Sequence, residues 1–146
     1  FEVAAYLRRC GADITRVRKV FREDFDDYQA KADAISRADI YRNAYAISSV
    51  EKNGSESPTV LCAKAANELL NIRGIKASIV LTKVENTVFL SARSIDELNV
   101  QVLMEKLGGG GHRTVAGAQI EGKEIKDCIN LVKNAIDEMI VEGEVA

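Results

Sequence analysis

The sequence predicts an α/β fold: a mixed β-sheet of about five strands flanked by helices and preceded by an N-terminal helical segment. Three observations support this prediction. Apolar residues keep a helical spacing through residues 1–38. From residue 39 the segments follow the order strand, helix, strand, strand, helix, glycine loop, strand, helix. A hydrophobic fraction of 47% over 146 residues is enough for one compact core.

Residues 1–38 are predicted to be the helical tail of a preceding domain plus a linker. Their third helical segment offers few apolar residues for burial: Phe25, Tyr28, Ala32 and Ile35. Its start is acidic, as is typical of a solvated helix face that complements the helix dipole, with Glu23, Asp24, Asp26 and Asp27. The chain begins at Phe1 without an initiator methionine, so we expect it to be a fragment of a longer protein.

Residues 39–146 are predicted to form a separate α/β unit. Its first strand covers residues 40–48, which are rich in β-branched and aromatic side chains, and turn-forming residues follow. The dipeptide Ser57-Pro58 begins a helix, because proline at the first helical position gives up an amide hydrogen that would be unpaired anyway. That helix runs to about Leu70, with an alanine-rich face suited to close packing.

The middle of the unit is predicted to be a β-hairpin. Residues 75–84 and 87–94 read as strands on either side of Glu85 and Asn86, and asparagine tolerates the left-handed torsions of a tight turn. In the second strand Val88, Leu90 and Ala92 alternate with a more polar set. Arg93 belongs to that polar set, so it points away from the apolar face.

The C-terminal part is predicted to be helix, glycine loop, strand and helix. Residues 99–107 form a short helix that Gly108 ends, and residues 115–121 form a strand. The last helix has the clearest helical spacing in the chain, with apolar residues at 125, 128, 129, 132, 135, 136, 139 and 140.

Composition excludes several classes of protein. A net charge of -2 argues against a surface for duplex DNA, which usually shows a strong basic excess. Cys10, Cys62 and Cys128 are far apart and form no CxxC pair, so neither a disulfide framework nor a zinc site is indicated, and a reducing compartment is expected. No apolar run reaches the roughly 18 residues that a membrane span needs, so we expect no direct membrane contact.

The segment "KLGGGGHRTVAGAQ" is the strongest candidate for a binding site. Gly108, Gly109, Gly110 and Gly111 precede the single histidine of the chain, His112. Successive glycine amides can form a concave nest for an anion, and Lys106, His112 and Arg113 would surround it with positive or titratable groups. Arg93 offers a bidentate fork for phosphate oxygens. The structural alternatives are that Gly108 ends a helix, that the other glycines let two backbones cross, and that Arg93 and His112 are ordinary surface residues.

The string "LSARSIDELNVQVLMEKLGGGGHRTVAGAQIEG" resembles the DHH-associated domain of the DHH-family phosphoesterases. The resemblance covers residues 39–146, and the long string is most similar to that of bacterial membrane-anchored cyclic-di-AMP phosphodiesterases. "FEVAAYLRRCGAD" resembles the final helix of their catalytic DHH domain.

The resemblance implies that this chain is the substrate-binding part of a cyclic dinucleotide phosphodiesterase. Arg93 matches the phosphate-binding arginine of the family, and Gly108 to Gly111 with His112 match the segment that holds the phosphate or base. Catalysis would belong to two Mn²⁺ ions in the parent's DHH domain, whose motifs have no counterpart here. We therefore expect no metal and no catalytic residue in this chain, a cytoplasmic location, and an intramolecular partner in the DHH domain.

Several readings stay open. The parent could be an oligoribonuclease or single-strand exonuclease of the same superfamily, with a short linear oligonucleotide as substrate. The chain could be a noncatalytic module that binds nucleotides and regulates, or a structural or dimerisation domain whose glycines only turn the chain. The sequence leaves the base specificity, the role of Arg113 and homodimerisation undecided.

Overall fold

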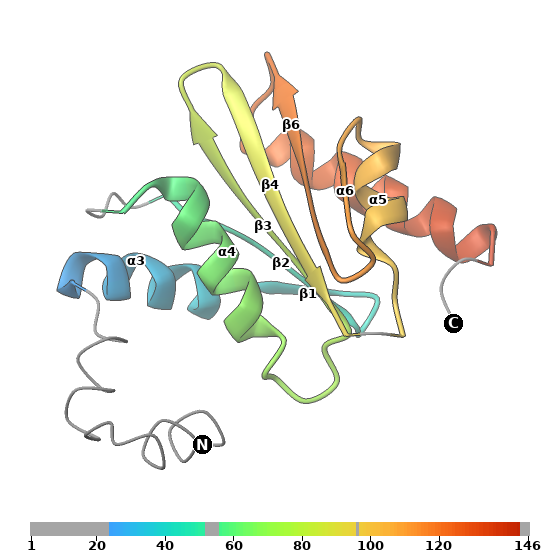
Figure 1. Ribbon diagram of the computed structural model, residues 1–146, viewed down its shortest axis with the longest axis horizontal. Coiled ribbons are helices and arrows are strands. Elements are labelled where there is room, and N and C mark those ends of the chain that lie inside the picture. The colour runs from blue at the N-terminus through green and yellow to red at the C-terminus, as the bar shows by residue number, and fades with distance from the viewer. Residues whose placement is uncertain (1–23, 52–55, 96, 144–146) are drawn as a thin grey trace, which may run out of the picture.

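The computed structural model describes residues 24–51, 56–95 and 97–143 (Figure 1). The two helices predicted before residue 23, with Cys10, lie outside these ranges. The described elements, in chain order, are α3 (Phe25–Ser36), β1 (Asp39–Tyr41), β2 (Tyr45–Ser49), α4 (Pro58–Leu69), β3 (Ala77–Val84), β4 (Thr87–Ser94), α5 (Val100–Lys106), β5 (Gly110–Gly111), β6 (Val115–Glu121) and α6 (Ile125–Val141).

The predicted α/β class is confirmed, with six strands rather than about five. The strands follow the order β1-β2-β3-β4-β6-β5, and β2 and β3 are the parallel pair in an otherwise antiparallel sheet. The extra strand arises because residues 40–48 do not form one strand. Arg42 and Asn43 both have positive φ angles and turn the chain between β1 and β2.

The hairpin between β3 and β4 turns at the predicted residues, but the left-handed residue is Glu85 (φ 56°) rather than Asn86. The turn is therefore set by the pairing of the two long strands. Val84 pairs with Thr87, which leaves two residues to connect them. Strand pairing has overridden the local preference of asparagine for this conformation.

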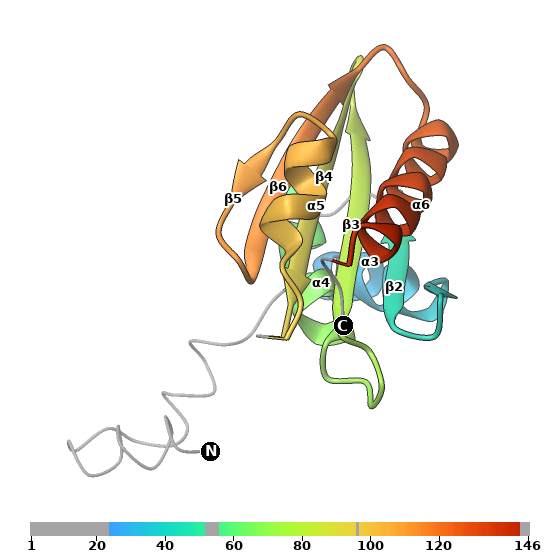
Figure 2. The same cartoon turned by 90° about the vertical axis from the view of Figure 1, so that its right-hand side faces the viewer.

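Helices cover both faces of the sheet, so the fold has three layers (Figures 1 and 2). On one face α5 and α6 bury the alternate apolar residues of the strands, including Ile79, Leu81, Val88 and Leu90. The predicted inward face of α6 is confirmed for Cys128, Val132, Ala135, Ile136 and Met139, whereas Ile140 is exposed. This continuous apolar layer forms the main core of the fold.

The other face is covered by α3 and α4, which are joined to the sheet by buried hydroxyl groups. Ser48 donates to the carbonyl oxygen of Ala34 in α3, and Ser78 donates to that of Ala66 in α4. The small side chains on α4 let the helix lie close to the strands, as its alanine-rich face predicted. Ala65 and Ala66 are fully buried there.

The predicted buried face of α3 is wrong for Phe25 and Tyr28, which are 71% and 56% exposed, and for Ala32, whereas Ile35 is half-buried against the core. The fully buried residues of α3 are Asp27, Ala30, Lys31 and Ala34. Ala30 and Ala34 are small enough for close helix packing. Asp27 belongs to the acidic run expected to be solvated, yet it is buried and accepts a hydrogen bond from the amide of Glu56. The Lys31 ammonium pairs with Glu68 of α4 at 3.0 Å.

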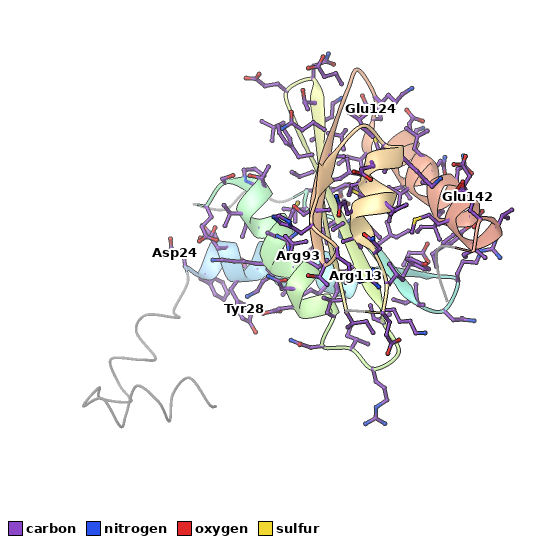
Figure 3. All side chains as sticks on the ribbon, turned by 45° about the vertical axis from the view of Figure 1, so that its right-hand side comes forward. Asp24, Tyr28, Arg93, Arg113, Glu124 and Glu142 are labelled. Carbon is purple, nitrogen blue, oxygen red and sulfur yellow. The ribbon has the colours of Figure 1, made fainter. Side chains whose placement is uncertain are left out.

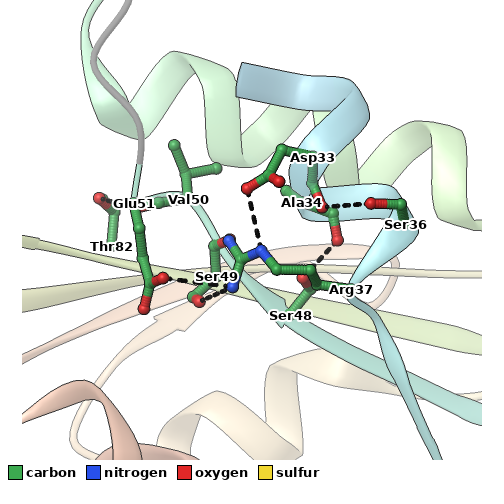
Figure 4. Close-up of polar contacts among 9 residues, drawn as sticks. All are labelled: Asp33, Ala34, Ser36, Arg37, Ser48, Ser49, Val50, Glu51 and Thr82. Atoms are coloured by element: carbon green, nitrogen blue, oxygen red, sulfur yellow. Dashed lines mark hydrogen bonds and ion pairs between the residues drawn. The ribbon is translucent and has the colours of Figure 1, made fainter. Parts of the chain in front are cut away.

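Arg37 anchors the end of α3 to β2 (Figure 4). Its guanidinium donates to the Ser49 carbonyl oxygen at 2.6 Å and to Asp33 at 2.9 Å, and it pairs with Glu51 at 3.3 Å. One planar fork thus ties together a helix end, a strand end and the following loop. The helix α3 is therefore an integral layer of the fold.

Candidate functional site

The β4–β6 ladder has one face that no helix covers completely. The residues of β4 on the α5/α6 side are buried, whereas Thr87, Phe89, Ser91 and Arg93 on the opposite side are half-buried. In β6 the corresponding residues Val115, Gly117, Gln119 and Glu121 are exposed or half-buried. Since α3 lies over β2 and α4 lies over β3 and part of β4, the sheet stays accessible beside α4, toward β6 (Figure 1).

A pocket of about 610 Å³ lies over this accessible part of the sheet. Its size is in the range of small-molecule and cofactor sites. Its lining residues come from the first turn of α4, from β4, from the glycine segment and from β6: Thr59, Phe89, Leu90, Ser91, Gly108, Gly109, Gly117, Ala118, Gln119 and Glu121.

The structure explains why glycine is needed at three positions of the segment. Gly108 has a φ angle of 85° and ends α5, as predicted. A Cβ atom at Gly109 would lie 2.1 Å from the carbonyl oxygen of Gly117, and one at Gly111 would lie 2.5 Å from the Cα of Ala116. The backbones of the segment and of β6 therefore approach so closely that side chains at 109 and 111 are excluded. Gly110 and Gly111 form the short edge strand β5 rather than a loop.

The expectation of a row of free amides needs correction. The amide of Gly108 donates to the carbonyl oxygen of Glu105, that of Gly109 to Met104, and that of His112 to Val115. These three bonds close the helix end and the β5–β6 turn, so the three amides are already engaged. What Gly108 and Gly109 contribute to the pocket is a wall without side chains.

Arg93 lies on the open face, two residues beyond Ser91 along β4 (Figure 3). Its Nη1 donates to the Ala92 carbonyl oxygen at 2.9 Å, and it makes no other hydrogen bond within the described ranges. Burial lowers the pKa of the guanidinium from its ordinary value, but an arginine stays charged. The site thus holds a partly desolvated cation with most of its five donors available.

His112 lies at the turn between β5 and β6, with an exposed side chain. Its amide donates to Val115, and Val115 pairs with Arg93 on the other side. His112 and Arg93 therefore flank Val115, with their backbones about two strand spacings, or roughly 10 Å, apart. Neither residue lines the pocket itself; both lie beyond its Ser91 and Gly117 end.

Lys106 does not take part in the site. Its ammonium pairs with Glu142 at 2.5 Å and Glu138 at 3.5 Å, both on α6. The hydrogen bond to Glu142 raises the pKa of Lys106. The spacing in the sequence placed this lysine beside the glycines, but the turn of α5 directs it toward the opposite layer. Arg113 comes shortly before β6 begins, at the end of the sheet where β4 ends with Arg93 and Ser94 (Figure 3).

The two serines on either side of Arg93, Ser91 and Ser94, have different surroundings. Ser91 lines the pocket, whereas Ser94 is buried and donates to the carbonyl oxygens of Leu98 and Arg113. Phe89, Gln119 and Thr59 also line the pocket, although no motif in the sequence marked them. Alternation in β4 placed Phe89 on the same face as Arg93, but only the pairing of β4 with β6 reveals that Gln119 lies opposite it.

Within the described ranges there is no group of three or more His, Cys, Asp or Glu residues that could hold a metal ion. Cys62 and Cys128 are both buried free thiols. None of the helices in those ranges combines the length and apolar character that crossing a bilayer requires.

Comparison with known proteins identifies the domain. The chain is 41% identical over 145 residues to the cyclic-di-AMP phosphodiesterase GdpP of Bacillus subtilis (strain 168), covering 98% of this chain and 22% of that protein. It is 36% identical over 138 residues to the cyclic-di-AMP phosphodiesterase PdeA of Listeria monocytogenes serotype 1/2a (strain 10403S), covering 94% and 21%. The chain thus spans about a fifth of the length of these curated relatives.

The fold has a solved counterpart in an exopolyphosphatase-related protein from Bacteroides fragilis. The TM-score is 0.74 at 18% identity, with 92% of this chain and 42% of that chain covered. The DHHA1 domain family matches residues 42–141, which include every residue of the pocket. The resemblance inferred from the glycine segment is therefore confirmed: the chain belongs to the DHHA1 domain family.

Proposed function

We propose that this chain is the substrate-binding domain of a phosphodiesterase that hydrolyses a cyclic dinucleotide, with cyclic-di-AMP as the substrate. The observation that carries the proposal is the pocket walled by Gly108 and Gly109 on the sheet face that also presents Arg93. A concave site with one cation beside it suits a ligand that has both phosphates and bases. The names of the two bacterial relatives support the choice of cyclic-di-AMP.

In this proposal Arg93 binds a phosphate. A guanidinium matches two phosphate oxygens with two parallel N–H donors, and partial burial strengthens such a bond. The single hydrogen bond to Ala92 directs the side chain without occupying the rest of the fork. Arg93 would thereby fix one phosphate of the ring at the end of the pocket.

His112 is proposed to contact the same phosphate or its neighbour. Its imidazole is exposed at a turn whose backbone is held by the bond from the His112 amide to Val115. Because Val115 of β6 lies between His112 and Arg93, the two side chains would approach the ligand from the two sides of β6. Two separate contacts fix orientation better than one, which is what an attack in line with the leaving group requires.

The chemistry of hydrolysis is proposed to lie in the DHH domain of the parent, with Mn²⁺. The residues described here do not fit a metal centre, since no three potential ligands gather among them. No catalytic step is therefore assigned to this chain, and the isolated chain is predicted to bind nucleotide weakly and hydrolyse nothing. A membrane-anchored parent with this domain on the cytoplasmic side stays a prediction, as does the division into units at residues 38 and 39.

The test is a titration of the 146-residue chain with cyclic-di-AMP, followed by calorimetry and by amide NMR shifts. Arg93→Met is expected to weaken binding by roughly 10-fold or more, as for loss of a charge-assisted contact. Lys106→Met is the matched control, because it removes one positive charge from a residue paired with α6, and it should leave the Kd unchanged.

Three results would contradict the proposal. The first is that the chain binds no dinucleotide at millimolar concentration, the second is that Arg93→Met binds as well as the control, and the third is that the pure chain hydrolyses the substrate with Mn²⁺. Tighter binding of linear pApA than of the cyclic ligand would favour a parent that acts on short linear oligonucleotides.

A further inference from the structure

The charge of the residues at the pocket changes from one end of the β4–β6 ladder to the other. On the open face the directly opposed pairs are, in order, Arg93 with Val115, Ser91 with Gly117, Phe89 with Gln119, and Thr87 with Glu121. Arg93 is thus the cation at one end, and Glu121 is the single charged residue among those that line the pocket. A phosphate is attracted to the first end and repelled from the second, so the uncharged part of a nucleotide is directed toward Phe89 and Gln119.

Phe89 gives the pocket an aromatic floor. Its side chain is half-buried on the sheet, and the first turn of α4 contributes Thr59 to the lining. The next pair toward Arg93 contains Gly117, where no side chain rises above the sheet. A flat ring can therefore lie on Phe89 and extend over Gly117 toward the phosphate end. Arg93 lies four positions after Phe89, about 13 Å along the strand, which a nucleoside and the arginine side chain together span.

Gln119 stands beside this floor. It is directly opposite Phe89, so their Cβ atoms are about 5 Å apart on the same face. Its side chain is exposed and makes no hydrogen bond within the described ranges. A ring stacked on Phe89 would present its edge to the Gln119 carboxamide, which offers one acceptor and two donor hydrogens.

We propose that the pocket is an adenine site, in which the base stacks on Phe89 and Gln119 pairs with its N6 and N7 atoms. The inference rests on the proposed function and assigns the base end of the same ligand. Glutamine matches adenine, because its carbonyl oxygen accepts from the N6 amino group while its amino group donates to N7. Guanine presents two acceptors, O6 and N7, on that edge, so the Gln119 carbonyl oxygen would face an acceptor.

The test compares cyclic-di-AMP with cyclic-di-GMP on the 146-residue chain by NMR titration and calorimetry. Phe89→Leu is expected to weaken the binding of both ligands by about 10-fold, because it removes a stacking surface. Gln119→Leu is expected to reduce a preference for cyclic-di-AMP of about 10-fold to near equality. The matched controls are Phe25→Leu and Gln29→Leu on the exposed face of α3, and both should keep the wild-type affinity and preference.

The outcomes separate this inference from the proposed function. If the wild-type chain binds cyclic-di-AMP and Arg93→Met loses it, the proposed function holds. Under that condition, a Phe89→Leu or Gln119→Leu variant with the affinity and preference of its control would overturn the adenine site, and so would a wild-type preference for cyclic-di-GMP. If the wild-type chain binds neither ligand, both proposals fail. The amide spectrum of Phe89→Leu verifies that the variant is folded.

Discussion

The Ser94 hydroxyl lies 2.6 Å from the carbonyl oxygen of Leu98 and donates a hydrogen bond to it. The same hydroxyl reaches the carbonyl oxygen of Arg113 at 3.2 Å. One buried side chain therefore joins the end of β4 to the turn before α5 and to the segment that follows His112. The neighbour of Ser94 in the chain is Arg93, so this bond positions the proposed phosphate-binding residue relative to the histidine turn.

Ser94→Ala is expected to destabilise the fold, because the two carbonyl oxygens lose a buried donor. The free energy of unfolding should fall by about 1 to 3 kcal/mol in urea denaturation. Ser91→Ala is the matched control: Ser91 lines the pocket and its hydroxyl makes no hydrogen bond within the described ranges, so its replacement should leave stability nearly unchanged. Equal stability of the two variants would show that the Ser94 hydrogen bonds do not stabilise the fold.

Gly109→Ala and Gly110→Ala test the close approach of the glycine segment to β6. A methyl group at 109 would collide with backbone atoms of Gly117 and Ala118, whereas one at 110 meets nothing within 4 Å. Gly109→Ala should lower the free energy of unfolding by about 3 kcal/mol or more, because backbone cannot move aside as a side chain can. Gly110→Ala should change it by less than about 1 kcal/mol.

Thermal and urea unfolding of both variants give the measurement. A Gly109→Ala protein as stable as Gly110→Ala would mean that β5 and β6 are not in contact at this point.

Local signals in the sequence predicted most of the elements but not the contacts between them. Pro58 began α4, Gly108 ended α5 and the spacing from Ile125 defined α6, because each signal acts within a few residues. The clash that forbids a side chain at Gly109 involves Gly117, eight residues away on another strand. No local pattern carries that information.

Two wrong predictions have the same physical origin. Phe25 and Tyr28 were assigned to the buried face of α3, but the helix packs against α4 mainly through the small side chains of Ala30 and Ala34. Lys106 was assigned to the glycine segment by proximity in the sequence, but Glu138 and Glu142 attract it to α6. In both cases a partner far along the chain decided the outcome.

Tyr45→Phe is expected to maintain or raise stability. Tyr45 is buried in the core, and its hydroxyl is the buried side-chain polar atom without a hydrogen-bond partner among the described residues. Removing a hydroxyl that has no partner removes a desolvation cost of about 1 kcal/mol. Tyr41→Phe is the control, since the Tyr41 hydroxyl donates to Asp137 at 2.8 Å and its loss should destabilise. The prediction fails if Tyr45→Phe unfolds at a lower urea concentration than the wild-type chain.

Cys62 is expected to make the fold less stable as the pH rises into the alkaline range. Burial raises the pKa of its thiol from 9.0 to about 12, against a smaller opposite effect of a hydrogen bond with the Val50 backbone. Below pH 9 the thiol is protonated in both the folded and the unfolded chain, so its contribution to stability is complete. Between the unfolded pKa and about 12, only the unfolded chain ionises, and the contribution is progressively lost.

The measurement is the free energy of unfolding of the wild-type chain and of Cys62→Ala at about pH 8 and about pH 10.5. Lysines and tyrosines titrate in both proteins, so the difference between the two pH slopes isolates Cys62. The wild-type chain should lose about 1 to 2 kcal/mol more than Cys62→Ala over this interval, as expected from 1.36 kcal/mol for each unit of pKa shift. Parallel slopes would mean that the thiol is as easily ionised in the folded chain as in the unfolded one, and hence that α4 does not keep it away from solvent.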